Sequence, residues 1–494
     1  MVKPVIEPVI EPVIESAAPS NNSDNSDNSD NSDDVTHTAH RQAAIPTPQG
    51  VKIFRRIEWV LNPVAYLERT KTQTPDFFVE DSLGFGFGPI VVTSHPEAIR
   101  YILSRDHTKF TSPGEFNSIL SPLIGDSSVI MLSGDRHKER RQLVTPAFHG
   151  ERLDVYGQLI CNLTKANADK LTVGEPFLAR GLAQKLSLET ISQVVFGLTD
   201  SHRSKEIMAV MTKMLDRLGS PTSALLIFFD RLQKDLGAWS PWGRFVRLRQ
   251  QLDDLVYEEI RDRREAALHN LDAAPTDILS MLMAARTETG EALSDKELRD
   301  ELMALLMAGH ETTATAIAWA MYWVHKHDDI KDRLLAELET VGPDASPMAI
   351  AQLPYLSAVC QETLRRSPVA MFTFPRVAQV PVEFMGYRFA AGTTFLGCIF
   401  LTHQREDLYP EPKAFRPERF LEKKFSPYEF IPFGNGTRRC IGAALAQYEM
   451  QLTLATLLGN YQFRLADSKP ELPRRRGVTL SPSRGVPMIF EAKK

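Results

Sequence analysis

The ten residues Phe433-Gly-Asn-Gly-Thr-Arg-Arg-Cys440-Ile-Gly442 (the cysteine loop) are followed directly by the apolar run AALAQYEMQLTLATLL, residues 443–458. The run has helical periodicity, which places Cys440 just before the N-terminus of a helix. Unpaired backbone N–H groups and the helix dipole favour a thiolate there. The glycines of the loop let its backbone approach a flat ligand closely. These features predict a loop that directs a sulfur at a metal and donates N–H groups to that sulfur.

The alternative interpretation of Cys440 is a buried, inert thiol beside a turn, which is the usual state of a cysteine. We apply that interpretation to Cys161, Cys360 and Cys398, which lie in apolar stretches. The cysteine loop, in contrast, matches the pattern F-x-x-G-x-R-x-C-x-G at all five fixed positions. It resembles the haem-binding loop of the cytochromes P-450, the haem-thiolate monooxygenases.

The resemblance implies roles for four residues of this pattern. It also implies a cofactor, haem b (iron protoporphyrin IX). Cys440 would be the axial ligand of the haem iron, and Gly442 completes the haem-binding pattern. Arg438 would pair with a haem propionate, and Phe433 would shield the sulfur. The charge of Arg438, two residues before the sulfur, suits an anionic group on the same ligand.

Two further segments are expected if the resemblance holds. Glu362 and Arg365 lie three residues apart on one face of a predicted helix, and Arg419 follows in an irregular stretch. Taken alone, such a pair is a common solvated contact. Together the three resemble the family's Glu–Arg–Arg triad, which locks the segment that carries the cysteine loop, and they would be structural rather than catalytic.

A long apolar helix is interrupted by Ala308-Gly-His-Glu-Thr-Thr313. Gly309 costs that helix about 1 kcal/mol relative to Ala, and such a local violation marks a candidate site, with the missing side chain making room for a ligand. The alternative is a capping Thr or an exposed acid. The segment resembles the family's oxygen-activating helix, which makes Glu311 and Thr312 the catalytic acid–alcohol pair that orders water and delivers protons. We expect His310 to be a surface or core residue.

A third segment, GDRHKERRQLVTPAFHGERL (134–153), places His137 and Arg141 on one helical face. It resembles the propionate-binding helix of soluble bacterial members, with His137 in place of the commoner Trp, and it is similar to cyanobacterial members associated with fatty-acid hydroxylation. Arg376 matches another propionate contact. The resemblance spans roughly residues 50–490.

Composition supports one large soluble domain. Eight acidic and two basic residues lie within residues 1–50, so that the remaining 444 residues carry 54 acidic and 55 basic side chains. This neutral body has no nucleic-acid footprint. The repeats PVIE and Asn-Ser-Asp predict a disordered low-complexity tail over residues 1–44. Residues 45–494 are predicted to form a single haem domain that is mainly α with small β-sheets, the cytochrome P-450 fold.

Helices are expected around Leu182–Val195 and Leu298–Val324, and strands near Ile90–Val92, Val382–Phe389 and Pro487–Phe490. Residues 402–439 are expected to be irregular. Four cysteines make no disulfide framework. Prolines and glutamates interrupt the apolar start, which argues against a signal peptide, and no apolar run is long enough for a membrane anchor. We therefore expect a cytoplasmic monomer.

Apolar segments suggest a greasy substrate, although each residue is equally well explained by core packing. The candidate lining segments are 116–120, 225–229, 371–374 and 478–480. No reductase sequence follows the cysteine loop, so electrons are expected from a separate ferredoxin and ferredoxin reductase. The bases Arg405, Lys423, Lys424 and Arg439 are candidates for an acidic-ferredoxin docking face, or ordinary solvated charges.

The resulting hypothesis is a haem-thiolate monooxygenase that uses O2 to hydroxylate an apolar substrate such as a fatty acid, alkane or terpenoid. A peroxide-using or hydroperoxide-rearranging haem-thiolate enzyme is the alternative within catalysis, but such members commonly lack the acid–alcohol pair. The non-enzymatic alternative is a haem sensor or carrier, which would not need Glu311 and Thr312.

Overall fold

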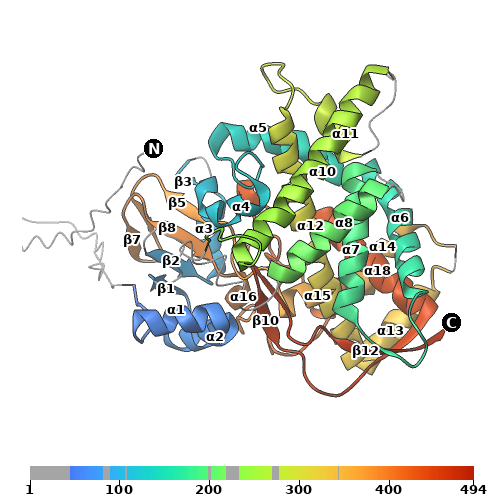
Figure 1. Ribbon diagram of the computed structural model, residues 1–494. Coiled ribbons are helices and arrows are strands. Elements are labelled where there is room, and N and C mark those ends of the chain that lie inside the picture. Colours follow the sequence, from blue (N-terminus) through green and yellow to red (C-terminus); the bar gives the residue numbers. More distant parts are fainter. Residues whose placement is uncertain are drawn as a thin grey trace, which may run out of the picture.

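The structure is a computed structural model that describes residues 45–81, 89–105, 108–197, 202–218, 233–269, 277–342 and 344–494. Figure 1 shows helices packed together on one side and a sheet beside α1 and α2 on the other. The mainly helical architecture with small sheets confirms the predicted fold class. The predicted tail, residues 1–44, lies outside the described residues, and so does the candidate lining segment 225–229.

Helices make up most of the described chain. In chain order they are α1 (Lys52–Leu61), α2 (Pro63–Gln73), α3 (Pro96–Leu103), η1 (Gly114–Leu120), α4 (Ser121–Ile124), α5 (Gly134–Val144), η2 (Thr145–Phe148), α6 (Glu151–Ala168), α7 (Ala179–Phe196), α8 (His202–Leu218), α10 (Pro241–His269), α11 (Ile278–Ala284), α12 (Asp295–Lys326), α13 (Asp328–Glu339), α14 (Pro347–Ala351), α15 (Pro354–Arg366), α16 (Ile399–Thr402), α17 (Arg419–Glu422), η4 (Gly436–Arg438) and α18 (Ala443–Asn460).

The strands form one five-stranded sheet and three smaller ones. The large sheet has the order β1-β2-β8-β5-β3, and only β2 and β8 run parallel. The others are β4-β12-β9, β10-β11 and β6-β7. Their bounds are β1 (Phe77–Glu80), β2 (Ile90–Thr93), β3 (Phe110–Thr111), β4 (Pro176–Leu178), β5 (Arg376–Ala378), β6 (Val382–Phe384), β7 (Tyr387–Phe389), β8 (Thr394–Gly397), β9 (Tyr461–Leu465), β10 (Pro473–Arg476), β11 (Thr479–Pro482) and β12 (Pro487–Lys493).

The central helix, α12, begins with a complete capping box. The Ser294 side chain accepts the backbone N–H of Glu297, and the Glu297 carboxylate accepts the N–H of Ser294. This reciprocal pair satisfies two N–H groups that have no partner within the helix. The helix then runs for 32 residues to Lys326, about 48 Å at 1.5 Å per residue. It confirms the helix expected over Leu298–Val324.

The other predicted elements are confirmed with small shifts of their ends. The helix expected over Leu182–Val195 is α7, which ends where Gly197 takes the left-handed conformation with φ 61°. The strands expected near Ile90, Val382 and Pro487 are β2, the β6-β7 hairpin and β12. Residues 402–439 contain only the short elements α17 and η4 after the end of α16, which confirms the irregular stretch.

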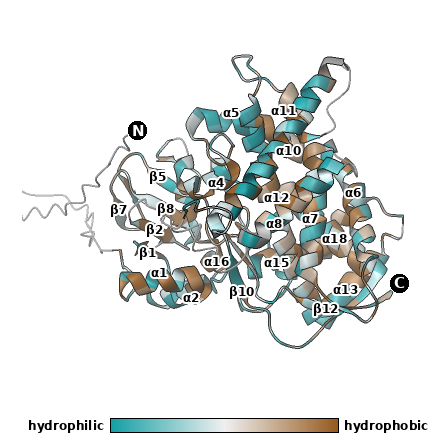
Figure 2. Cartoon of the chain, in the orientation of Figure 1, coloured by the Kyte–Doolittle hydropathy of each residue, from teal (hydrophilic) through white to brown (hydrophobic). Residues whose placement is uncertain are grey.

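Two apolar clusters meet along α12 and account for its position. One cluster joins α12 to α6, α7, α8, α10 and α11, and the other joins it to α13, α15, β9 and β12. Figure 2 shows hydrophilic residues on the outer helices α5 and α10. Removing this apolar area from water, at about 25 cal/mol per Å², is the main force that fixes α12 within the helical part.

Among the described residues, no helix combines the length and apolar character needed to cross a membrane. All four cysteines are free thiols, as the sequence predicted.

Candidate active site

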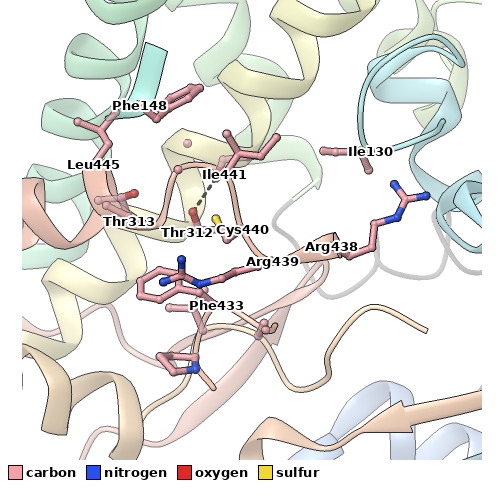
Figure 3. A pocket seen from close by; sticks show the side chains of 18 of the residues that line it. Ile130, Phe148, Thr312, Thr313, Phe433, Arg438, Arg439, Cys440, Ile441 and Leu445 are labelled. Atoms are coloured by element: carbon pink, nitrogen blue, oxygen red, sulfur yellow. Dashed lines mark hydrogen bonds between the residues drawn. The ribbon is translucent and has the colours of Figure 1, made fainter. Parts of the chain in front are cut away.

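A cavity of about 410 Å³ lies between α12, α5, the strand segment before β5 and the cysteine loop. The side chains around it are mostly apolar, and Cys440 and Thr312 both line it. Figure 3 shows the two side chains together with Phe433, Ile441 and Leu445. The cavity therefore brings a thiol from one element and a hydroxyl from another to the same, mainly apolar space.

The cysteine loop is shaped by two tight turns before α18. The Cys440 N–H donates to the Phe433 carbonyl at 2.9 Å, and the Asn435 side chain accepts the N–H of Gly436 at 2.8 Å. Gly434 has φ 64°, which a side chain would disfavour. A Cβ atom added at Gly434 or Gly442 would meet nothing within 4 Å, and both glycines line the cavity. The backbone is thus bare on the side that a flat ligand would cover.

The donor set and the shape of the cavity fit haem b. The Cys440 thiol faces the cavity, apolar side chains form most of its walls, and four basic side chains border it. Those side chains suit the two negatively charged propionates of the porphyrin. They are His137, Arg141, Arg438 and Arg439.

The Cys440 thiol is accessible from the cavity although protein surrounds it on its other sides. Burial raises its pKa above the usual value, while the backbone N–H of Gly442 and the cations Arg141 and Arg439 oppose that rise. The predicted effect of the helix N-terminus, which favours the thiolate, is therefore present but smaller than the opposing effect of burial. Removing the thiolate from water costs more free energy than the helix terminus and the arginines supply by stabilising its charge.

Arg438 already has hydrogen-bond partners in the protein backbone. Its guanidinium donates to the carbonyls of Val129 at 3.0 Å, Ser112 at 2.6 Å and Leu132, and it lies 4.5 Å from the centre of the Phe374 ring. Arg438 thus joins the cysteine loop to residues 112–132 while lining the cavity.

The other predicted propionate contacts divide into two groups. His137 and Arg141 of α5 line the cavity, as the sequence predicted, and His137 is 5% exposed. Arg376, at the start of β5, is buried and does not belong to the lining. Its guanidinium donates to the carbonyls of Phe374 at 2.9 Å and Asn435 at 3.1 Å. Arg376 therefore links the sheet to the cysteine loop through the backbone.

The α12 segment carries the Thr312 hydroxyl to the cavity but not Glu311. Thr312 Oγ1 donates to the Ala308 carbonyl at 2.6 Å. Glu311 is not part of the lining, and its carboxylate accepts from Arg180 Nη2 at 2.6 Å and Gln184 Nε2 at 3.1 Å, both on α7. His310 is 3% exposed and contacts the Gln184 carbonyl at 3.0 Å, which confirms a core residue.

Gly309 lines the cavity, as does Ile191 of α7. A Cβ atom at position 309 would lie 2.8 Å from Cδ1 of Ile191. The missing side chain therefore also permits close packing of α7 on α12, a role that the sequence did not predict. Ser187 of α7 donates to the Gly309 carbonyl at 3.1 Å across the same contact.

The predicted triad is assembled in the buried core beside the cysteine loop. Arg365 makes two hydrogen bonds to the Glu362 carboxylate, at 2.7 and 2.8 Å, and Arg419 Nε donates to the same carboxylate at 3.2 Å. Arg365 also donates to the carbonyls of His403, Pro412 and Ala414, and Arg419 to those of Pro410 and Glu411. The two arginines replace regular secondary structure as partners for the backbone carbonyls of residues 403–414.

The candidate substrate segments are only partly correct. Asn117, Phe372, Thr373 and Phe374 line the cavity, whereas none of residues 478–480 does. Leu480 is buried instead and its carbonyl accepts the indole N–H of Trp319 at 3.2 Å. Sequence reasoning missed the apolar residues that α12 and the segment before α5 contribute. They include Val129, Ile130, Ala304, Leu305 and Ala308.

Glu449 of α18 is a further lining residue that sequence reasoning missed. It is 3% exposed, and burial raises the pKa of its carboxyl to about 8, while a hydrogen bond with Ser187 opposes the rise. The sequence does mark this residue, because Glu449 is the single acid within the apolar run 443–458.

The four candidate docking cations have different surroundings in the structure. Arg405 is largely buried in ion pairs with Asp76 at 2.6 Å and Asp407 at 2.8 Å, and Arg439 lines the cavity. The ion pairs of Arg405 argue against its use on a docking face, because its charge is already paired. Lys423 and Lys424 remain exposed.

An apolar cavity at a cysteine loop beside a long central helix defines a haem-binding oxygenase. Residues 81–488 match the family model of cytochrome P450, and the chain belongs to that family. It is therefore a monooxygenase whose cofactor is haem b.

Relatives of known name agree. The chain is similar to cytochrome P450 135B1 of Mycobacterium tuberculosis, with 35% identity over 83% of this chain and 84% of that protein. It is 36% identical to cytochrome P450 137 of the same organism over 77% and 78% of the two chains. A solved structure, retinoic acid-bound cyanobacterial CYP120A1, superposes with a TM-score of 0.76. At 21% identity over 91% of this chain and 100% of that one, it shows the fold alone.

Proposed function

We propose that this monooxygenase hydroxylates an apolar substrate, of the class of fatty acids, alkanes or terpenoids, within the cavity described above. The observation that carries the proposal is a cavity of about 410 Å³ with mainly apolar walls and the Cys440 thiol facing it. Apolar walls select by the area they remove from water, about 25 cal/mol per Å². Haem, when bound, supplies the chemistry that activates O2 and inserts one of its oxygen atoms.

Cys440 is the proposed axial ligand, since it alone of the four cysteines lines the cavity in the described part of the chain. Phe433 lines the same side, and Gly434 and Gly442 leave the backbone bare there. His137, Arg141 and Arg438 are proposed to neutralise the propionates. Arg376 is proposed to act on that site through the Asn435 carbonyl that it holds.

Glu311 and Thr312 are the proposed proton-delivering pair. Thr312 presents its hydroxyl at the cavity wall. Glu311, held by Arg180 and Gln184, is one residue away on the α7 side of the helix. In this proposal the Glu311 carboxylate takes up a proton from water. A rotation of the Glu311 side chain about its own bonds would then carry that proton toward Thr312.

Electrons are proposed to come from a separate ferredoxin and ferredoxin reductase. The exposed amines of Lys423 and Lys424 offer positive charge beside the segment that carries the cysteine loop. Such charges raise the association rate with an acidic partner and make that rate fall with salt. A cytoplasmic location, which would supply these partners, stays a prediction.

The experiment that tests the proposal uses the haem-loaded protein. Dodecanoic acid, dodecane and a monoterpene are titrated while the haem spin state is recorded, and hydroxylated product is then measured with NADPH, reductase and ferredoxin. A spin-state shift followed by NADPH-dependent product supports the monooxygenase hypothesis. Product with peroxide only would favour the peroxide-using alternative. Binding without turnover under either condition would favour a sensor or carrier.

A further inference from the structure

A short segment of the cavity wall, residues 126–132, has no regular secondary structure, yet its backbone is held on both sides. Val129 and Ile130 of this segment line the cavity. Their position sets the distance between the wall and any molecule that the cavity holds. The contacts that hold residues 126–132 in place therefore affect which substrate the cavity can accept.

Two neighbouring acids on α12 accept the backbone N–H groups of the segment. Asp300 Oδ2 accepts from Asp126 at 3.1 Å and from Ser127 at 3.0 Å. Glu301 Oε2 accepts from Val129 at 2.9 Å. Three N–H groups within four residues thus end on two carboxylates that are more than 170 positions away in the sequence. No β-ladder or helix supplies a partner for these N–H groups, so the carboxylates take that part.

The two acids are themselves held by cations and are almost completely buried. Asp300 is 2% exposed and pairs with Arg299 at 2.8 Å and with Lys296 at 3.0 Å. Glu301 is 0% exposed and lies 3.4 Å from Arg140 Nη1 of α5. Arg140 donates in turn to the Ser127 carbonyl at 2.9 Å. Buried, charge-assisted hydrogen bonds of this kind are stronger than neutral ones.

Steric fit reinforces the contact. Gly125, which precedes the segment, has φ 73°, and a Cβ atom there would lie 2.2 Å from Asp300 Oδ1. On the other side of the segment, Arg438 donates to the carbonyls of Val129 and Leu132. Three N–H groups of the segment therefore face α12, and the carbonyls of Val129 and Leu132 face the cysteine loop.

We propose that Asp300 and Glu301 are positioning residues for substrate: by holding residues 126–129 against α12, they place Val129 and Ile130 at the cavity wall and so limit the size of the apolar molecule accepted there. The proposal rests on the proposed function only in taking the cavity as the substrate site. Asp300 and Glu301 do not line the cavity, so they act through the segment.

The contact between the Glu301 carboxylate and the Val129 N–H also depends on pH. Burial raises the pKa of Glu301 to about 7, although Arg140 and the Val129 N–H oppose that rise, and Asp300 adds to it. These are the charged and donor groups that face Glu301 from α5, from the segment and from α12. Because Oε1 accepts no hydrogen bond among the described residues, a proton can be added there while Oε2 stays bound. Protonation removes the negative charge and weakens the hold on Val129.

The test compares the haem-loaded parent with Glu301→Gln, Asp300→Asn and the matched control Glu297→Gln. Glu297 lies one turn before Glu301 and also contacts Arg140, at 2.7 Å, but accepts no N–H from the segment. Hydrogen–deuterium exchange of residues 126–129 is measured first. Both test variants should exchange faster there, and the control should not. Unchanged protection in both test variants would overturn the proposal; Asp300→Asn serves alone if Glu301→Gln does not fold.

The affinities for two haem ligands of different size then measure the effect on the position of the cavity wall. Imidazole is small, whereas 4-phenylimidazole places a ring in the apolar part of the cavity. The affinity for 4-phenylimidazole should change about fivefold in the test variants, the effect of one hydrogen bond, with imidazole unchanged. After correction for protonation of the two ligands themselves, the ratio of the two affinities in the parent should shift between pH 8 and pH 6, and Glu301→Gln should abolish that shift. Equal changes for both ligands would overturn the proposal. Failure of dodecanoic acid to bind would instead reject the proposed substrate class.

Discussion

The carboxylate of Glu311 lies 2.6 Å from Arg180 Nη2, on the α7 side of the helix whose next residue, Thr312, faces the cavity. The acid and the alcohol are neighbours in sequence and face different surroundings. One is held by a cation, and the other donates to the backbone carbonyl of Ala308. Proton delivery from Glu311 to Thr312 therefore requires that the Arg180 contact opens.

This geometry predicts distinct effects for the two residues. Glu311→Gln keeps the side-chain size but cannot carry a proton, so the rate of product formation should fall about 10²-fold or more, the usual contribution of general acid catalysis. Thr312→Ala should instead divert reducing equivalents to peroxide. The rates of NADPH consumption, product and peroxide are measured together. Unchanged coupling of NADPH to product in Thr312→Ala would contradict its role, and Thr312→Ser is the matched control.

Cys440→Ser should abolish the red-shifted absorption band that carbon monoxide gives with the reduced haem, because a serine oxygen replaces the thiolate. Cys360→Ser is a control, since Cys360 is buried in the apolar cluster around α12. Persistence of the band in Cys440→Ser would remove Cys440 as the ligand.

Gly309→Ala should lower stability through its contact with Ile191. The added methyl carbon would lie 2.8 Å from Ile191 Cδ1, and overpacking of this kind costs about 1–3 kcal/mol. Ile191→Ala removes both Cδ1 and Cγ1, which would lie 2.8 and 2.9 Å from the added carbon. In that background Gly309→Ala should cost less, or even stabilise the protein by about 1 kcal/mol because Ala is the better helix former. The free energy of unfolding of the four proteins forms a double-mutant cycle, and additive effects would reject the contact.

Glu362→Gln should destabilise the protein by about 3–5 kcal/mol, because it leaves the buried cations Arg365 and Arg419 without their charge partner. Since both arginines also hold carbonyls in the stretch that carries the cysteine loop, the variant should lose haem more readily. Thermal unfolding and the rate of haem transfer to apomyoglobin measure the two effects. Glu418→Gln is a suitable control, because Glu418 pairs with the half-exposed Arg333. Equal haem loss in both variants would contradict the structural role.

Glu449 predicts how stability depends on pH. The pKa of its carboxyl in the folded protein, about 8, is above the value of 4.5 that it has when exposed. The folded state therefore binds a proton more tightly, and stability contributed by Glu449 is present below pH 4.5 and is lost as pH rises toward 8. Between pH 6 and pH 9 the parent should lose stability relative to Glu449→Gln. Thermal unfolding at both pH values checks this, and parallel changes would show that Glu449 is not the cause.

Much of the fold followed from local patterns, and so did part of the site. Periodic apolar residues predicted α7 and α12, and the spacing within residues 433–442 predicted the cavity-facing cysteine, because these signals depend on neighbours in the sequence. What was missed depended on distant contacts. The packing role of Gly309 could not be inferred without Ile191, and Arg405 could not be judged without Asp76. The roles of Asp300 and Glu301 could not be inferred without residues 126–129, whose N–H groups they accept.

Arg438 donates to the backbone carbonyls of residues 112, 129 and 132 and also lines the cavity. One side chain thus joins the cofactor side of the cavity to its substrate wall. Thermodynamic linkage makes any such coupling reciprocal. A cofactor that orders Arg438 would stiffen the wall, and a ligand that stiffens the wall would in turn hold the cofactor more tightly. If Arg438 couples the two in this way, the retention of haem and the fit of a ligand at the wall should change together.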